Sequence, residues 1–436
     1  DGNYPTGTEN VALGDTALDS VESGGAWNVA IGAKALTALT TGDANTAVGR
    51  IAMESATTGG NNTALGYAAL NANTTASNNT AVGYQALTAN TTGASQTAIG
   101  YNALGANTTG SQNTVIGYDA LSNATAQINS TVIGYNTARS ASGSNLTAIG
   151  TQTFYGSSTG DNNTGVGVNV GYDNTSGSSL TGVGSEALRK NTTASNNTAV
   201  GYQAGYSNTT GTDLVAIGSG AAYSNTTGAG NMAMGQNALY SNTTGAGNTA
   251  LGTQLTGTGN ASLNQNTTGN YNTAAGTSSL KSNTTASNNT AFGYHAAFSN
   301  TTGTGLTAIG YSAMSFNTTG NYNVAIGAAG ASGGTALNVN TTGSSNVAVG
   351  NGALQANTTA SYNTAVGYQA AYLSTTATGL TALGHQAMYS NTTGANNVAL
   401  GGGVPGSQYS ALQSNTTGGS NTAVGVAALG QNTTAS

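Results

Sequence analysis

The chain has 436 residues, with 67 glycines, no cysteine and a formal net charge of −6, and only 4% of its residues are charged. A typical soluble domain has about 25% charged residues, so the composition argues against an ordinary globular domain. The lack of cysteine excludes disulfides and thiolate metal sites, and the six scattered basic residues cannot form the basic surface that nucleic-acid binding needs.

A short motif recurs along the whole chain. The stretch NTTASNNTAVGYQA at residues 73–86 returns unchanged at 191–204 and with one change at 357–370. The glycine that ends T-A-V-G occurs in 24 copies in all, and eighteen of the 23 spacings between them are 17 residues. Seventeen residues are too few for a βαβ unit or for most helical repeats, but they fit one coil of a parallel β-solenoid, in which identical residues stack about 4.8 Å apart. We therefore predict an all-β parallel β-solenoid, or β-roll, of about 24 coils that spans residues 1–436 as a single repeat array.

The first element of each repeat is a predicted four-residue strand, as at residues 80–83. It reads Thr or Val, usually Ala, an apolar residue and Gly, which places β-branched residues on one face and small residues on the other. We expect the apolar residue before the glycine to point inward, so that Val82→Asp destabilises the fold strongly. The residues expected in this core ladder are Leu65, Val82, Ile99, Ile116, Ile133, Val200, Ile217, Ile309, Ile326 and Val366.

The segment after the glycine carries tyrosines in two registers. Five consecutive repeats have a tyrosine directly after the glycine, at positions 67, 84, 101, 118 and 135, and three have one five residues after it, at 206, 223 and 240. Stacking of the rings along the solenoid is the structural interpretation. An aromatic strip that binds sugars is the functional one.

The last element of the repeat is a polar corner with the sequence N-T-T. It matches the N-glycosylation pattern, which requires an exposed loop in a secreted protein. An asparagine turn capped by threonine hydroxyls is the structural alternative. Ice binding through the ranked threonines is a further alternative, although a tight corner makes a poor plane. The candidate glycosylation sites are Asn73, Asn90, Asn107, Asn191, Asn208, Asn225, Asn242, Asn266, Asn283, Asn300, Asn317, Asn340, Asn357, Asn391, Asn415 and Asn432.

Three repeats are longer than the rest. Their extra residues lie near 253–265, 328–339 and 402–414, between the post-glycine segment and the N-T-T corner. We expect them to form loops along one edge without disturbing the coils that follow. Because neither end carries a polar capping repeat, we also expect the sequence to be part of a longer fibre or to join end to end into a filament.

The residues that catalysis needs are scattered. His295 and His385 fall in repeats five apart, and the acidic residues hold different phases of the repeat, so no pair of titratable groups is brought together. We expect no catalytic site, no metal site and no cofactor. No apolar run approaches the 18 residues of a membrane span.

The motif N-T-A-V-G-Y-Q-A-L resembles the head repeats of trimeric autotransporter adhesins, the YadA-like head, and the repeats of tail-fibre-like proteins. Residues 28–32, 323–327 and 346–350 carry the same pattern. The resemblance implies a β-roll that forms homotrimers and binds host surfaces or matrix, with cell-surface or matrix glycans as possible partners. We therefore expect a structural and adhesive shaft of an extracellular, cell-surface or virion fibre. The alternatives are a glycosylated scaffold fibril and an ice-binding solenoid.

Overall fold

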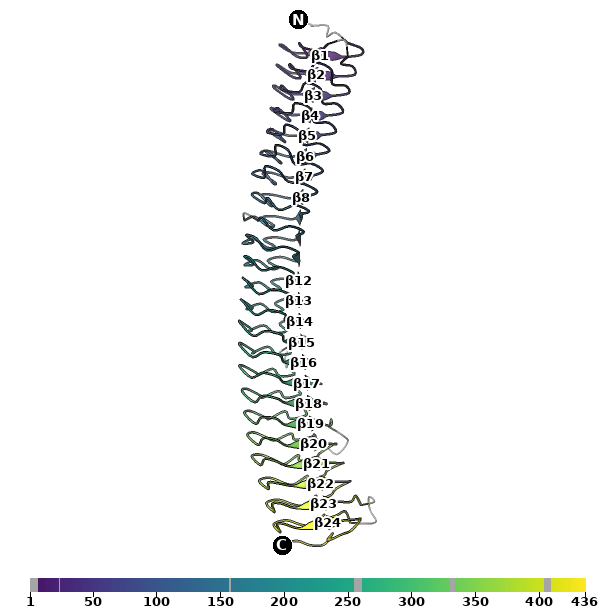
Figure 1. The fold of residues 1–436 in the computed structure, drawn as a ribbon, viewed down its shortest axis with the longest axis vertical. Helices are drawn as coiled ribbons and strands as arrows, with labels where there is room; N and C mark the ends of the chain where they lie inside the picture. Colours follow the sequence, from purple (N-terminus) through teal and green to yellow (C-terminus); the bar gives the residue numbers. More distant parts are fainter. Residues whose placement is uncertain (1–6, 23, 157, 255–260, 330–333, 404–408) are drawn as a thin grey trace. The chain divides into compact units, whose positions relative to one another are not determined.

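The computed structural model describes residues 7–22, 24–156, 158–254, 261–329, 334–403 and 409–436. These residues form short parallel strands joined by turns, and they contain no helix. The chain divides into two compact units, residues 1–212 and 213–436. Within each unit, one strand per coil stacks above the next (Figure 1). The predicted β-solenoid is confirmed.

Each strand has three residues, and the glycine that follows belongs to the turn. The strands of the first unit are β1 (Val11–Leu13), β2 (Val29–Ile31), β3 (Thr46–Val48), β4 (Thr63–Leu65), β5 (Thr80–Val82), β6 (Thr97–Ile99), β7 (Thr114–Ile116), β8 (Thr131–Ile133), β9 (Thr147–Ile149), β10 (Thr164–Val166), β11 (Thr181–Val183) and β12 (Thr198–Val200). Those of the second unit are β13 (Val215–Ile217), β14 (Met232–Met234), β15 (Thr249–Leu251), β16 (Thr273–Ala275), β17 (Thr290–Phe292), β18 (Thr307–Ile309), β19 (Val324–Ile326), β20 (Val347–Val349), β21 (Thr364–Val366), β22 (Thr381–Leu383), β23 (Val398–Leu400) and β24 (Thr422–Val424).

Neighbouring coils are in exact register. Strand β5 pairs in parallel with β6 so that Thr80 lies beside Thr97 and Val82 beside Ile99. The turns are also hydrogen-bonded from coil to coil, since the amide of Leu87 donates to the carbonyl of Ala103 at 2.9 Å. Each coil therefore satisfies its backbone groups through its neighbours, which is the condition for a stable solenoid.

The long repeats keep this register. Strand β15 pairs directly with β16, β19 with β20 and β23 with β24, although each pair is separated by an insertion in sequence. This confirms that the insertions leave the following coils undisturbed. The predicted loops themselves, near 253–265, 328–339 and 402–414, lie partly outside the described residues.

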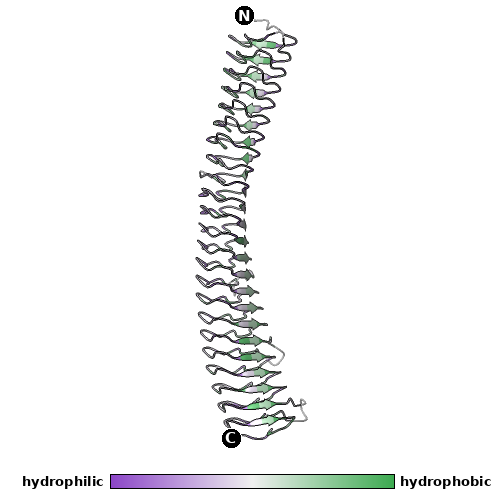
Figure 2. Cartoon of the chain, in the orientation of Figure 1, coloured by the Kyte–Doolittle hydropathy of each residue, from purple (hydrophilic) through white to green (hydrophobic). Residues whose placement is uncertain are grey.

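The interior of the coil is narrow and is filled mainly by small residues. In the β5 coil the buried side chains are Ala81 from the strand, Ala86 and Leu87 from the turn, and Asn79 and Asn90 from the corners. Figure 2 shows hydrophobic residues concentrated on the strands and hydrophilic ones on the turns. Alanine, leucine and asparagine thus recur as the inward set from coil to coil.

The predicted core ladder points the wrong way. Leu65, Ile99, Val200, Ile217, Ile309, Ile326 and Val366 are exposed, and Val82, Ile116 and Ile133 are half-buried. Side chains alternate along a strand, so placing alanine inward turns the residues on both sides of it outward. The opposite placement would turn two larger side chains of each strand inward, such as Thr80 and Val82, in place of one alanine. A 17-residue coil has no room for both, so the alanine face is the inward one.

Candidate surface and interior rows

The asparagines of the N-T-T corners stack in an interior row wherever successive coils carry them. In the β5 coil, Nδ2 of Asn90 donates to the carbonyl of Gly93 at 2.9 Å and to Oδ1 of Asn73 at 3.3 Å. In the second unit, Nδ2 of Asn283 donates likewise to Oδ1 of Asn266 at 2.8 Å and to the carbonyl of Ala286 at 3.0 Å. We call these stacked side chains the amide row.

The burial of the amide row bears directly on the sixteen candidate glycosylation sites. Fifteen of them, all except Asn432, have no exposed surface. A glycan would have to be attached to Nδ2, and that atom is inside the coil and hydrogen-bonded. The exposed loop that glycosylation requires is therefore not present at these asparagines in the folded chain.

The corner threonines divide into two kinds. The first threonine of a corner is hydrogen-bonded to the next coil. For example, Oγ1 of Thr91 donates to the carbonyl of Thr108 at 3.0 Å. The second, such as Thr92, is exposed. The first threonine therefore caps the turn, as the structural alternative predicts, and its hydroxyl donates to the next coil rather than to a ligand on the outer surface.

A second row of buried amides precedes the strands, and the sequence analysis did not identify it. The backbone amide of Asn79 donates to Oδ1 of Asn62 at 2.9 Å, and Nδ2 of Asn79 donates to the carbonyl of Gly93 at 3.0 Å. The sequence does mark this row, because an asparagine begins the recurring motif N-T-A-V-G. It was missed because its role depends on a carbonyl fourteen residues away.

The outer strand face carries the pre-glycine residues, which we call the outward apolar row. Leu65 is 48% exposed, and Ile99 and Val200 are each 37% exposed. Threonine occupies the other outward position of most strands, as Thr80 does in β5. Most strands thus expose one aliphatic side chain and one threonine hydroxyl to solvent, whereas β17 exposes Phe292 and β16 ends in Ala275.

The tyrosines that directly follow the glycine stack on one another. Ring centroids from Tyr67 to Tyr135 are 4.8 to 5.5 Å apart in successive coils. The guanidinium of Arg50 lies 5.8 Å from the centroid of the Tyr67 ring, at the end of this stack. In the other register, Tyr223 and Tyr240 are 5.0 Å apart. Structural stacking is confirmed, and the stacked faces are not open to a sugar.

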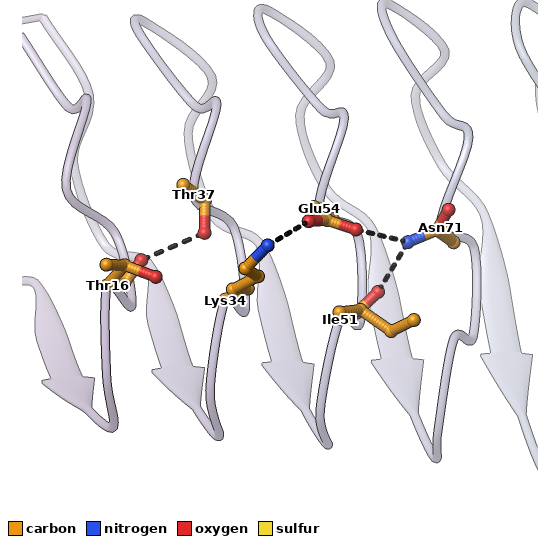
Figure 3. A network of polar contacts seen from close by, with 6 residues as sticks. All are labelled: Thr16, Lys34, Thr37, Ile51, Glu54 and Asn71. Atoms are coloured by element: carbon orange, nitrogen blue, oxygen red, sulfur yellow. Dashed lines mark hydrogen bonds and ion pairs between the residues drawn. The ribbon is translucent and has the colours of Figure 1, made fainter.

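Several charged side chains form ion pairs or hydrogen bonds with residues of neighbouring coils. Figure 3 shows Lys34 paired with Glu54, whose other oxygen accepts from Asn71. Nη1 of Arg189 donates to the hydroxyl of Tyr206 at 2.8 Å, and this hydrogen bond raises the pKa of Arg189. These cations bond to neighbouring coils rather than forming a basic surface.

The two histidines do not meet. His295 follows β17 and stacks on Tyr294, whereas His385 follows β22 and stacks on Tyr368. Burial, with a contribution from the charge of Lys281, lowers the pKa of His295 below its usual value. Among the described residues, no group of three histidine, aspartate or glutamate side chains could hold a metal ion.

No protein-family model matches the chain, and comparison with curated proteins and with solved structures gives no match. Nor does any helix in the described part of the chain have the length and apolar character to cross a membrane.

Proposed function

We propose that the chain is the structural and adhesive shaft of an extracellular or virion fibre, without catalysis, and that it assembles as a homotrimer through the outward apolar row. The observation that carries this proposal is the exposure of one aliphatic side chain in coil after coil on the same face. Contiguous apolar surface of this kind marks an interaction site.

The energetics favour association. A fully buried Val, Leu or Ile contributes roughly 1.5–3 kcal/mol, and about a third of each of these side chains is still exposed, so covering the remainder contributes about 0.5–1 kcal/mol per coil. Across the twelve strands of one unit the sum is on the order of 6–12 kcal/mol. Such a gain offsets much of the cost of associating rigid bodies.

A second and third copy of the same chain are the natural partners. Because the row repeats with the coil spacing, another copy presents the same spacing and matches it along the whole unit. Three narrow strand faces arranged around an axis bring three rows together at its centre. The resemblance to YadA-like heads supports three copies rather than two.

The repeat architecture supports a shaft. Each coil contacts only its neighbours, so the structure can be lengthened by adding coils that make the same contacts. The glycosylated-scaffold alternative loses its support because fifteen of its sites are buried. The ice-binding alternative is weakened because the first corner threonine donates its hydroxyl to the next coil.

The experiment is a measurement of mass in solution. By sedimentation velocity, we expect the chain to have three chain masses and the double variant I116D/I133D to have one, since carboxylates in the row cannot be desolvated at a shared axis. The matched control is Q112D/N129D, which adds the same charge to exposed corners of the same two coils and leaves the trimer intact. A wild-type chain that stays monomeric at tens of micromolar would refute the assembly.

A further inference from the structure

Three tyrosines of the second unit lie outside the stacks described above. Tyr271, Tyr322 and Tyr362 each precede the buried asparagine that comes directly before a strand, and we call them the corner tyrosines. They are 68%, 67% and 73% exposed, which places them among the most exposed large side chains of the described residues. Nothing in the amide rows or the outward apolar row accounts for such exposure.

The corner tyrosines occupy one register position along the solenoid. The amide of Tyr322 donates to the carbonyl of Thr304, that of Ser345 to Asn321, and that of Tyr362 to Ser344. Successive coils therefore place residues 305, 322, 345 and 362 one above another. The three tyrosines precede strands β16, β19 and β21 and so lie in the same register along one corner.

Their rings are not covered by other rings. The Cδ1–Cε1 edge of Tyr322 lies against Gly305 of the preceding coil, where an added Cβ would come within 2.7 Å of Cδ1, and Tyr271 lies against Gly247 in the same way. Within the described residues, none of the three has a stacked aromatic neighbour, in contrast to the stack from Tyr67 to Tyr135. Their ring faces are therefore open for stacking against a ligand.

The surroundings are polar but almost without charge. Apart from His295 and His385, Asp213 and Lys281 are the only titratable acidic and basic side chains other than tyrosine in the sequence 213–436. Beside the corner tyrosines lie Asn270 and Asn321, whose Oδ1 atoms accept from backbone amides of the preceding coils. Each of these asparagines retains two Nδ2–H donors, and the exposed second threonines of the corners add hydroxyls. Aromatic faces with amides and hydroxyls, and without charge, suit a neutral ligand rich in hydroxyl groups.

The spacing selects an extended ligand. Three coils and two coils at about 4.8 Å each separate the tyrosines by about 14 Å and about 10 Å. An extended β-1,4-linked polysaccharide presents successive sugar rings in a straight ribbon and can reach all three. We propose that the corner tyrosines bind an extended, uncharged polysaccharide by stacking against its sugar rings. This inference rests on the proposed adhesive function and assigns it a ligand class and a site.

The test is native electrophoresis of the assembled protein through gels that contain a defined polysaccharide. Hydroxyethyl cellulose supplies the extended β-1,4-glucan, dextran a flexible neutral glucan, and dextran sulfate a charged polymer. We expect retardation by hydroxyethyl cellulose and little by the other two. Each tyrosine removed should weaken the apparent affinity by about two- to tenfold, in line with the strength of aromatic stacking.

The variant is Y271N/Y322N/Y362N. Asparagine suits the left-handed backbone at these positions and already occupies the same register in Asn288 and Asn396, so the fold should be retained. The matched control is Y294T/Y311T/Y368T, which removes three tyrosines that directly follow the glycine and uses the residue found there at Thr277. We expect the first variant to migrate without retardation and the control to migrate like wild type.

Three results would overturn the inference: equal retardation of the corner variant and wild type, retardation by dextran sulfate or dextran as strong as by hydroxyethyl cellulose, or no retardation of wild type. Sedimentation of the same samples separates this inference from the proposed assembly. A monomer that is retarded in a tyrosine-dependent way refutes the trimer and supports the site. A trimer that is not retarded refutes the site alone.

Discussion

The inward residue is small in all strands except β7 and β8, which have valine there, and neighbouring side chains compensate when the interior changes. In most strands the residue is alanine, but β10 has Gly165 and β11 has Gly182. An added Cβ on Gly165 would come within 2.7 Å of Cε2 of Phe154, which stands where other coils have leucine. The volume inside the coil is thus held nearly constant, as close packing requires.

The adjacent residues Ala81 and Val82 test which face is inward. Ala81→Asp places a carboxylate at a fully buried position and should destabilise the fold by on the order of 3 kcal/mol or more. Val82→Asp adds the same group at the half-buried outward position and should cost about 1 kcal/mol or less in the isolated chain. Thermal unfolding of both variants, with sedimentation to record assembly, makes the comparison. Similar losses of stability would contradict the outward placement of Val82.

The amide row is interrupted at Ser374, and the interruption can be repaired. Oδ1 of Asn357 and Oγ of Ser374 are buried without hydrogen-bond partners, and the coils on both sides have asparagine at this position. Ser374→Asn should extend the row between Asn357 and Asn391 and stabilise the second unit by about 1–2 kcal/mol.

Hydrogen exchange of the coils around β21 and β22 measures this effect. We expect slower exchange in S374N, whereas Thr376→Asn, at the exposed position two residues later, should leave it unchanged. Faster exchange in S374N would show that the row cannot accept another amide at this point.

At the scale of one coil, the turns depend on unusual backbone conformations. Asn78, Gln85 and Leu87 all have positive φ, between 53° and 63°, and Gly83 has φ 134°. Glycine is needed at 83 because the backbone of Gly100 in the next coil approaches it closely. The sequence predicted the 17-residue period correctly, since it follows from local spacing, but it placed Gly83 at the end of the strand, whereas the structure has it in the turn. It did not reveal the left-handed Leu87, because leucine rarely adopts that conformation without tertiary packing.

Two glycines separate the effect of close approach from that of φ alone. Gly83→Ala would bring Cβ within 2.7 Å of the carbonyl carbon of Gly100, so we expect a loss of roughly 3 kcal/mol or more and slower refolding. Gly230→Asn has no atom within 4 Å of the new Cβ and has φ 65°, which asparagine tolerates, so stability should be unchanged or slightly higher. Chemical denaturation provides the values. Tolerance of Gly83→Ala would mean that neighbouring coils can separate at this turn.

At the scale of the molecule, each unit is a stack in which strands pair only with those of adjacent coils. The repeat architecture could be predicted because every coil packs against its neighbours in the same way and therefore carries the same residues at the same positions. The inward face could not, because alternation along a strand allows two placements that differ only in which side chains fit a narrow interior. The corner tyrosines also escaped prediction, since the sequence shows their shared register but not their exposure, which only the folded coils reveal.

Removal of one whole coil should be tolerated. Deletion of residues 80–96 joins Asn79 to Thr97 and lets β4 pair with β6 in the same register. We expect a folded solenoid with a far-ultraviolet circular dichroism spectrum like that of wild type and a modest loss of stability. Deletion of residues 80–87 removes the strand and the turn of one coil but keeps its corner, and it should unfold the coils around it. Equal behaviour of the two deletions would contradict nearest-neighbour stacking.

The gaps in the amide row also bear on how the molecule would break under load. A pull along the coil axis strains the coil-to-coil junctions in series, so the weakest junction sets the force at which the whole array yields. Coils joined by the row share a side-chain bond in addition to their backbone bonds, whereas Asn107 and Asn357 each end a run with a buried oxygen that receives none. The same position also lacks an amide in the coils of Leu39, Ala56 and Ala141. A crack would therefore start at a junction without the row, beside Ala124 or Ser374 or among these coils, and the load that a unit withstands is set by its weakest junction rather than by its length.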